Sequence, residues 1–140
     1  MVPAQFSVRV TVRSYEIDFN GHVNQAVYHH YGEHARSEHL RQLGFNPAHT
    51  DHLGIVLLES TIRFLRELRL GDEIEVTSRI EFGTGRAFRI EHVLTRNDGV
   101  RAAEINCVLG LFDTQARRLV PGPKERLLAL ATRPELLDGS

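Results

Sequence analysis

The stretch from Tyr15 to Arg36 constrains the fold of this chain more than any other part of it. It begins as an extended segment, passes through a polar turn at Asn20 and Gly21, and continues into a long helix predicted over residues 25–43. Apolar and small residues recur in this helix at steps of three and four, which gives it one face suited to burial. The residues of that face are Tyr28, Tyr31, Gly32, Ala35 and Leu43.

Two residues set the predicted ends of the helix. Asn24 is a favourable N-cap, and Gly44 is a favourable stop at the C-terminal end. Gly32 costs roughly 1 kcal/mol in a helix interior. We therefore expect Gly32 to allow a close approach between the helix backbone and a sheet.

Alternating apolar and polar residues predict strands on both sides of the helix. The first run covers residues 6–12, and the later runs cover residues 55–70, 73–82, 86–96 and 100–112. Glycine-rich turns separate the later runs at residues 71–72, 83–85 and 97–99. The pattern predicts that these four strands are consecutive and antiparallel. Leu119 and Val120 are expected to add a short edge strand, and residues 124–131 a short helix.

This order of elements predicts an α+β fold, in which a curved antiparallel sheet of five to six strands wraps one long central helix. A chain of 140 residues has room for one core, so we expect a single domain over residues 1–140. The helix face that carries His29, Glu33 and Arg36 is left for solvent or for a partner.

Composition excludes several classes of protein. The 17 basic and 18 acidic residues leave a net charge of -1, so neither nucleic acid nor an anionic membrane is an expected partner. The single cysteine, Cys107, excludes an internal disulfide. No apolar run is long enough for a signal peptide or a membrane span, and we expect a cytoplasmic protein.

A motif lies at the junction of turn and helix. Its elements are Asp18, Gly21-His22-Val23-Asn24, Tyr28, Glu33 and Arg36. The motif resembles the signature of the hotdog-fold acyl-CoA thioesterases of the 4-hydroxybenzoyl-CoA thioesterase type. The resemblance implies the hotdog fold, hydrolysis of an acyl-CoA without a cofactor, and a homodimer or homotetramer whose subunits share a sheet and an active site.

Asp18 is the candidate catalytic residue, because a carboxylate beside the open N-terminus of a helix faces unpaired backbone N–H groups. It is expected to act as nucleophile or as general base on water, and both roles remain open. Following the family, the donor to the carbonyl oxygen is expected at the backbone N–H of Gln25 or a neighbour. The alternative interpretation of Asp18 is a residue that caps its own turn.

Three further residues surround this candidate site. His22 is expected either to orient water or substrate, or to bond the backbone of the turn. Asn24 is expected to act as a cap more than as a substrate contact, and Tyr28 to pack, with its hydroxyl at most at the edge of the site.

Coenzyme A carries phosphates, so cations are expected near the mouth of the pocket. Arg86 follows Gly83-Thr84-Gly85, and Arg89 and Lys124 are the other candidates. A hairpin turn with solvated arginines is the equal alternative.

The sequence also carries a pattern typical of a different class of enzyme. His30-Tyr31-Gly32-Glu33-His34 spells H-x-x-E-H, a zinc-hydrolase pattern, but no second helix offers a third ligand, so no metal site is expected. The other histidines, among them His39, are expected at the surface. An acyl-acyl carrier protein thioesterase and a non-catalytic acyl-CoA-binding protein remain alternatives. No segment matches the catalytic histidine of a hotdog dehydratase.

The acyl group stays open. Phenylalanines predict either an aromatic slot or the wall of a fatty-acyl tunnel, and they are Phe64, Phe82, Phe88 and Phe112.

Overall fold

The computed structural model describes residues 6–138, so the ends of the predicted domain, residues 1–5 and 139–140, lie outside it. The first half contains strand β1 (Phe6–Thr11), the short 3₁₀ turn η1 (Ser14–Glu16), helix α1 (Gln25–Leu43) and the 3₁₀ turn η2 (Pro47–His49). The second half contains strands β2 (Leu53–Phe64), β3 (Glu73–Phe82), β4 (Ala87–Arg96), β5 (Arg101–Asp113) and β6 (Arg118–Leu119), then helices α2 (Pro123–Leu130) and α3 (Glu135–Asp138).

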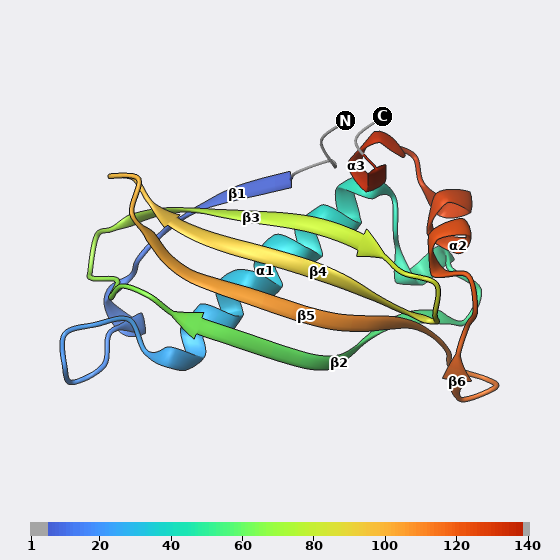
Figure 1. The fold of residues 1–140 in the computed structure, drawn as a ribbon, viewed down its shortest axis with the longest axis horizontal. Helices are drawn as coiled ribbons and strands as arrows, with labels where there is room; N and C mark the ends of the chain where they lie inside the picture. Colours follow the sequence, from blue (N-terminus) through green and yellow to red (C-terminus); the bar gives the residue numbers. More distant parts are fainter. Residues whose placement is uncertain (1–5, 139–140) are drawn as a thin grey trace.

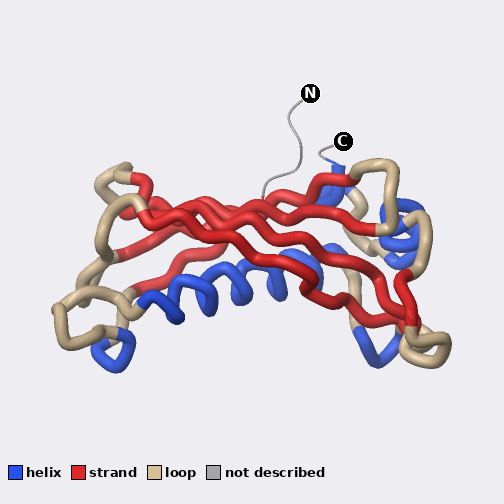
Figure 2. Tube along the Cα trace, turned by 60° about the horizontal axis from the view of Figure 1, so that its bottom comes forward, coloured by secondary structure: helices blue, strands red, loops and turns tan. Residues whose placement is uncertain are grey.

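The strands form one curved sheet, and α1 lies along its concave side (Figures 1 and 2). The strand order is β1-β3-β4-β5-β2, with β6 paired to β5, and all pairs are antiparallel. The prediction of a curved sheet wrapped around a long central helix is therefore confirmed.

The predicted place of β2 is wrong. This strand does not pair with β3, which follows it in the chain, but with β5, where Ser60 lies opposite Cys107. It also ends at Phe64, because the chain then leaves the sheet edge. The N–H of Leu65 donates to the carbonyl of Ala102 at 2.8 Å, and the N–H of Gly71 donates to that of Val12 at 3.2 Å. These bonds hold residues 65–72 across the end of the sheet, from the start of β5 to the end of β1. The connection between β2 and β3 is therefore too wide to be a hairpin.

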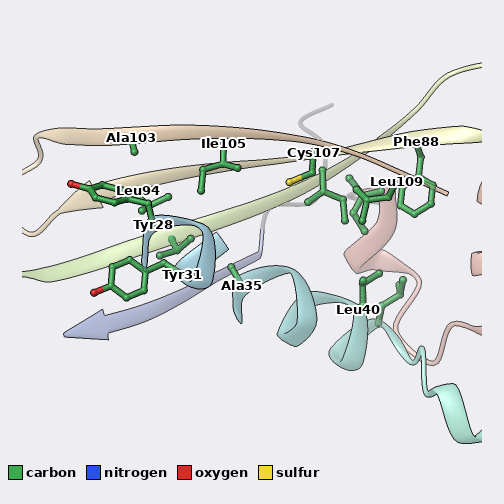
Figure 3. Packing of buried hydrophobic residues seen from close by; sticks show 14 of the residues in the cluster. Tyr28, Tyr31, Ala35, Leu40, Phe88, Leu94, Ala103, Ile105, Cys107 and Leu109 are labelled. Atoms are coloured by element: carbon green, nitrogen blue, oxygen red, sulfur yellow. The ribbon is translucent and has the colours of Figure 1, made fainter. Parts of the chain in front are cut away.

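The inner face of the sheet and one face of α1 form the core (Figure 3). Alternation in β3 buries the residues that the sequence predicts, Ile74, Val76, Ser78 and Ile80. The helix contributes Tyr28, Tyr31, Gly32, Ala35, His39, Leu40 and Leu43.

The predicted ends of α1 and its close approach to the sheet are confirmed. The Asn24 side chain accepts a hydrogen bond from the N–H of Ala26 at 2.9 Å, and Gly44 ends the helix with a φ of 124°. A Cβ atom on Gly32 would lie 3.0 Å from Cδ1 of Ile105. Because a real Cβ would crowd that side chain, glycine lets α1 pack closely on β5.

Two histidines are buried, so the expectation of surface histidines is wrong for them. His39 bridges elements: its Nε2–H donates to the carbonyl of Leu136 at 2.7 Å, and its Nδ1 accepts from the hydroxyl of Ser78 at 2.9 Å. The Nδ1–H of His92 donates to the carbonyl of Thr77 at 3.1 Å, while its enclosed Nε2 has no partner in residues 6–138. Burial lowers the pKa of His39, and it lowers the pKa of His92 to about 4.

Acidification is expected to destabilise the fold through His92. The pKa of His92 is lower in the folded chain than in the unfolded chain. Its contribution to the free energy of unfolding is therefore complete above about pH 6.5 and is lost as the pH falls towards about 4. Urea unfolding over this interval should show a loss on the order of 2 to 3 kcal/mol, and His92→Leu should flatten the dependence. His30→Gln, a change at an exposed histidine of α1, is the control and should leave the slope unchanged. An unchanged slope in the His92 variant would contradict the assignment.

Candidate active site

Asp18 lies in the turn between η1 and α1, with its side chain partly exposed. Its Oδ1 accepts hydrogen bonds from the N–H of Asn20 at 2.9 Å and from the N–H of His22 at 3.3 Å. Its own N–H donates to the carbonyl of His22 at 2.8 Å. Asp18 thus caps its own turn, and within residues 6–138 its second carboxylate oxygen accepts no protein hydrogen bond.

The turn is anchored on both sides to the body of the protein. Ile17 and Val23 pair as an isolated antiparallel bridge, and the N–H of Val23 donates to the carbonyl of Leu68 at 2.8 Å. The N–H of Asn24 donates to the carbonyl of Glu16 at 2.9 Å. Because both ends of the turn are held, the carboxylate has a fixed position relative to the start of α1.

The first helical N–H, that of Gln25, donates to no acceptor among the residues that the structure describes. The next N–H, that of Ala26, is occupied by the Asn24 side chain, as a cap requires. The start of α1 therefore presents one free backbone donor at the positive end of the helix dipole, and the turn that carries Asp18 leads directly into it.

Glu16 is a buried carboxylate that the sequence reasoning missed. The backbone N–H of Arg13 and the hydroxyl of Tyr31 donate to its Oε1 at 2.8 Å and 2.7 Å. The Arg13 guanidinium donates to its Oε2 at 2.7 Å. Burial raises the pKa of Glu16, but these hydrogen bonds and the charge of Arg13 outweigh burial, and the net pKa is lowered. The sequence does contain a signal for this contact. Glu16 stands three residues after Arg13, the N-cap residue of η1, and this is the spacing of a capping box.

Loss of the Glu16 charge is expected to loosen the anchor beneath Asp18. Glu16→Gln should lower the free energy of unfolding by about 1.5 to 3 kcal/mol at neutral pH. The reason is that the NH₂ group of glutamine cannot accept the hydrogen bonds that one of the two carboxylate oxygens accepts. The matched control is Glu38→Gln in the surface pair with Arg41, whose atoms lie 2.7 Å apart. Because that pair is solvent-exposed, its loss should lower the free energy of unfolding much less than the loss of the Glu16 charge. Equal losses in urea unfolding would contradict the role of Glu16.

The remaining predicted residues fall around this junction. His22 contributes its backbone to the turn, and its side chain is partly exposed. Tyr28 is buried, its ring lies edge-on to Phe64 with 5.1 Å between centroids, and burial raises the pKa of its phenol. Tyr28 therefore contributes to the core, and a place for its hydroxyl at the edge of the site stays a prediction.

The segments that carry the predicted phosphate-binding cations are the β3–β4 turn, the start of β4 and α2, and they lie at the opposite end of the sheet from the turn between η1 and α1 that carries Asp18 (Figure 1). Arg86 lines a cleft of about 430 Å³, where its guanidinium donates to the carbonyl of Leu119 at 2.8 Å. Arg118 and Arg126 line the same cleft, and neither was foreseen, because they are far apart from Arg86 in sequence. Arg89 and Lys124 are exposed outside this lining.

The four predicted phenylalanines do not meet in one slot. Phe64 lies opposite Ala103 at one end of the β2–β5 ladder, and Phe112 lies opposite Gly54 at the other. Phe82 and Phe88 pack together, with 5.6 Å between centroids. These four phenylalanines therefore form no common aromatic wall within one chain.

The H-x-x-E-H pattern lies on the outer side of α1, where His30 and His34 are exposed. Within residues 6–138, no group of three His, Cys, Asp or Glu side chains is arranged to hold a metal ion. In the same part of the chain, no helix is long and apolar enough to cross a bilayer.

The architecture is that of the hotdog fold, as predicted. A hypothetical protein of Staphylococcus aureus, solved in complex with CoA, superposes with a TM-score of 0.82 at 24% identity, covering 93% of this chain and 83% of that one. The 1,4-dihydroxy-2-naphthoyl-CoA thioesterase of Synechocystis gives 0.80 at 15% identity, covering 91% and 96%. A hypothetical protein of Aquifex aeolicus gives 0.78 at 29% identity, covering 89% and 98%.

The sequence comparison agrees with the structural one. Residues 12–130 match the thioesterase-like superfamily, and the chain belongs to it. The chloroplastic acyl-acyl carrier protein thioesterases ATL3 and ATL2 of Arabidopsis thaliana are 36% and 39% identical over 89 and 75 residues, which cover 62% and 52% of this chain. The matches span 47% and 40% of those longer relatives. The narrower 4-hydroxybenzoyl-CoA type stays a prediction.

Proposed function

We propose that this protein hydrolyses acyl thioesters of coenzyme A. The observation that carries the proposal is the Asp18 carboxylate, held in the turn that leads into α1, together with the free N–H of Gln25 at the start of that helix. Membership of the thioesterase-like superfamily supports the reaction class. The Staphylococcus aureus structure with CoA supports the choice of thiol carrier.

The geometry suits a thioester carbonyl held between charge and backbone. Its oxygen accepts from the N–H of Gln25, where the helix dipole stabilises developing negative charge. Asp18 either attacks the carbonyl carbon, giving an anhydride that water then hydrolyses, or takes a proton from the attacking water. In both courses the C–S bond breaks, the thiolate leaves and is protonated, and the acid is released. A thiol with a pKa of about 8.5 needs little help to leave.

Three neighbours support this junction without taking part in the chemistry. Asn24 holds the helix end by its cap, His22 closes the turn through its backbone, and Tyr28 packs one turn further along α1. The site therefore needs few catalytic side chains.

Asp18→Asn is expected to lower the rate of thiol release from a panel of acyl-CoAs by at least roughly 100-fold. Folding should be retained, since an asparagine oxygen can still accept from the N–H of Asn20. Asp98→Asn is the control, because Asp98 accepts from the N–H of Val100 at 3.1 Å in another turn. Activity near wild type for Asp18→Asn would contradict the catalytic role of Asp18, whereas binding of acyl-CoA without thiol release by wild type would favour the non-catalytic acyl-CoA-binding alternative.

Unpaired cations support coenzyme A as the carrier. Within residues 6–138, Arg86, Arg118, Lys124 and Arg126 take part in no ion pair, although arginines elsewhere commonly do. Arg86, Arg118 and Arg126 converge on one cleft, and Lys124 lies at the start of the adjacent α2. Guanidinium groups clamp phosphate oxygens in pairs, so this end of the chain suits the phosphates of the carrier.

A single chain keeps these cations away from Asp18. Helix α1 has 19 residues and spans about 28 Å. Asp18 precedes its start, whereas β6 and α2, which contribute Arg118 and Arg126 to the cationic cleft, lie towards its other end (Figure 1). The outer edge of β2 pairs with no strand in the described chain, and Leu57, Leu58 and Phe64 are about half exposed. Two copies joined antiparallel along β2 by a two-fold axis bring the cationic end of one towards Asp18 of the other. We therefore take a homodimer as the smallest active unit, with a homotetramer as a further assembly.

Mixed dimers test this shared site. Asp18→Asn and the double variant Arg118→Glu/Arg126→Glu should each be weakly active alone. Co-expressed, they should form hybrid dimers with one intact site, and thiol release should recover to about a quarter of wild type by random pairing of identical subunits.

The control for this experiment co-expresses Asp18→Asn with Asp18→Ala, which leaves no intact site in any dimer. Recovery there would reveal assay background. Failure of the Asp18 and arginine variants to complement each other, with hybrid dimers demonstrated, would contradict the shared arrangement.

An acyl carrier protein is the second candidate carrier, favoured by the 36% identity to an acyl-acyl carrier protein thioesterase. The same acyl group should be presented on both carriers. A kcat/KM that is higher for the acyl carrier protein thioester than for the acyl-CoA would favour the protein carrier. The cationic end of this chain would then bind an acidic surface of the carrier protein instead of the phosphates of coenzyme A.

A further inference from the structure

A second cleft, the β1 cleft, has a volume of about 430 Å³ and lies between strand β1 and the N-terminal half of α1. Four basic residues line it together with Tyr31: Arg9 and Arg13 come from β1 and the segment after it, and His30 and His34 come from α1. Within residues 6–138, no acidic residue belongs to this lining. The β1 cleft is therefore suited to an anion.

The β1 cleft lies apart from the residues that carry the proposed hydrolysis. Neither Asp18 nor the arginines of the cationic cleft line it. Strand β1 is also the edge of the sheet opposite to β2, along which two copies are proposed to pair (Figure 1). A ligand in the β1 cleft is therefore distinct from the thioester and its carrier in the proposed shared site.

Buried side chains hold Arg13 at the β1 cleft. Glu16 and Tyr31 are 5% and 2% exposed, and the Tyr31 hydroxyl donates to Glu16 at 2.7 Å. The same carboxylate accepts from Nη2 of Arg13 at 2.7 Å. The Arg13 side chain is nevertheless 54% exposed, and its Nε and Nη1 donate to no acceptor among the described residues. The buried carboxylate thus fixes the guanidinium by one nitrogen and leaves two nitrogens without a protein partner.

Arg9 adds a charge that the described chain leaves unpaired. It is exposed on β1, and within residues 6–138 it takes part in no ion pair. The residue opposite it in the β1–β3 ladder is an acid, Glu75, but the two side chains form no ion pair. A ligand that binds Arg9 therefore has no ion pair of this arginine to break.

The two histidines of the H-x-x-E-H pattern lie on the α1 side of the β1 cleft. His30 and His34 are one helical turn apart, so they share a face of α1, and both are exposed. Each imidazole has an N–H group that can donate. Glu38, one turn beyond His34, is bound by Arg41 at 2.7 Å. The pattern that forms no metal site thus adds two hydrogen-bond donors to the β1 cleft.

Protection of the sheet edge is the simpler reason for a cation on β1. A charged side chain on an edge strand prevents pairing with another chain. That function would need Arg9 alone. It requires neither the buried Glu16 that holds Arg13 nor the histidines on the other side of the cleft.

We propose that the β1 cleft binds the phosphate group of a small molecule. Two guanidinium and two imidazole groups offer more donors than one carboxylate needs, whereas a phosphate ester carries about 1.5 to 2 negative charges and three acceptor oxygens. A volume of about 430 Å³ lies in the range of sites for small organic ligands, so the cleft has room for more than the phosphate. Inorganic phosphate has the same chemistry without an organic part, and the experiment separates these two sources.

NMR titration of the full chain tests the proposal. The variant Arg118→Glu/Arg126→Glu serves as the background, because it removes the other cationic cleft. The ring signals of His30 and His34 are followed as adenosine 5′-monophosphate, inorganic phosphate or adenosine is added. The monophosphate should shift both signals to saturation, and adenosine, which lacks the phosphate, should shift neither. Tighter binding of the monophosphate than of inorganic phosphate would identify an organic ligand, and equal binding would identify free phosphate.

Two variants in the same background link binding to the lining. Arg9→Gln should weaken binding of the monophosphate by about fivefold to 20-fold, because it removes a charged donor from an exposed position. His34→Ala, read from the His30 signal, should weaken it by about twofold to tenfold. Arg101→Gln is the matched control: it makes the same change in net charge on β5, where Arg101 pairs with Glu104 at 2.6 Å. It should leave the affinity unchanged.

Three results would overturn the inference. The first is absence of a shift with either phosphate compound. The second is equal affinity in the background protein and its Arg9→Gln variant, which would show that net charge alone attracts the anion. The third is tighter binding of coenzyme A than of the monophosphate at the His30 and His34 signals, which would make the β1 cleft part of the carrier site.

Discussion

The contact between α1 and the inner face of the sheet at Gly32 fixes the position of the helix on the sheet, and the core and the cleft beside α1 depend on that position. With no side chain there, the helix packs against Ile105 at a distance that a Cβ would not allow. From this point α1 crosses the sheet diagonally: Tyr28, near its start, packs on Phe64 of β2, and His39, near its end, bonds to Ser78 of β3. The same close packing encloses His92 and removes its ring from water, which is why its pKa is so low.

A single helix that crosses diagonally cannot cover a whole concave face. The part left open lies between the C-terminal half of α1 and the start of β2, and it forms the cleft that Arg36 lines. β2 itself is an edge strand with half-exposed leucines, so the chain presents an unpaired edge and an open cleft side by side. The edge of β2 suits a second copy of the chain, and the shared site proposed above depends on that pairing.

Two carboxylates only two residues apart show how the environment divides their roles. Glu16 is buried, receives hydrogen bonds from Arg13 and Tyr31, and anchors the turn. Asp18 is partly exposed, and only one of its oxygens is held by the turn. In the sequence both are acids near a turn, and the motif singles out Asp18. The role of Glu16 depends on Tyr31, which reaches it only after α1 has folded back on the sheet.

The sequence by itself determined the local features: the ends of α1 at Asn24 and Gly44, the buried face of β3, and the turn around Asp18. Caps, alternation and turns depend on neighbours within a few residues, so their pattern can be read without a fold. Only the tertiary structure decided that β2 lies beside β5, that Arg118 joins Arg86, and that Arg36 is largely removed from solvent. Strand order depends on pairing between distant segments with equally suitable edges, and burial of a charged side chain depends on which segments those pairings bring around it.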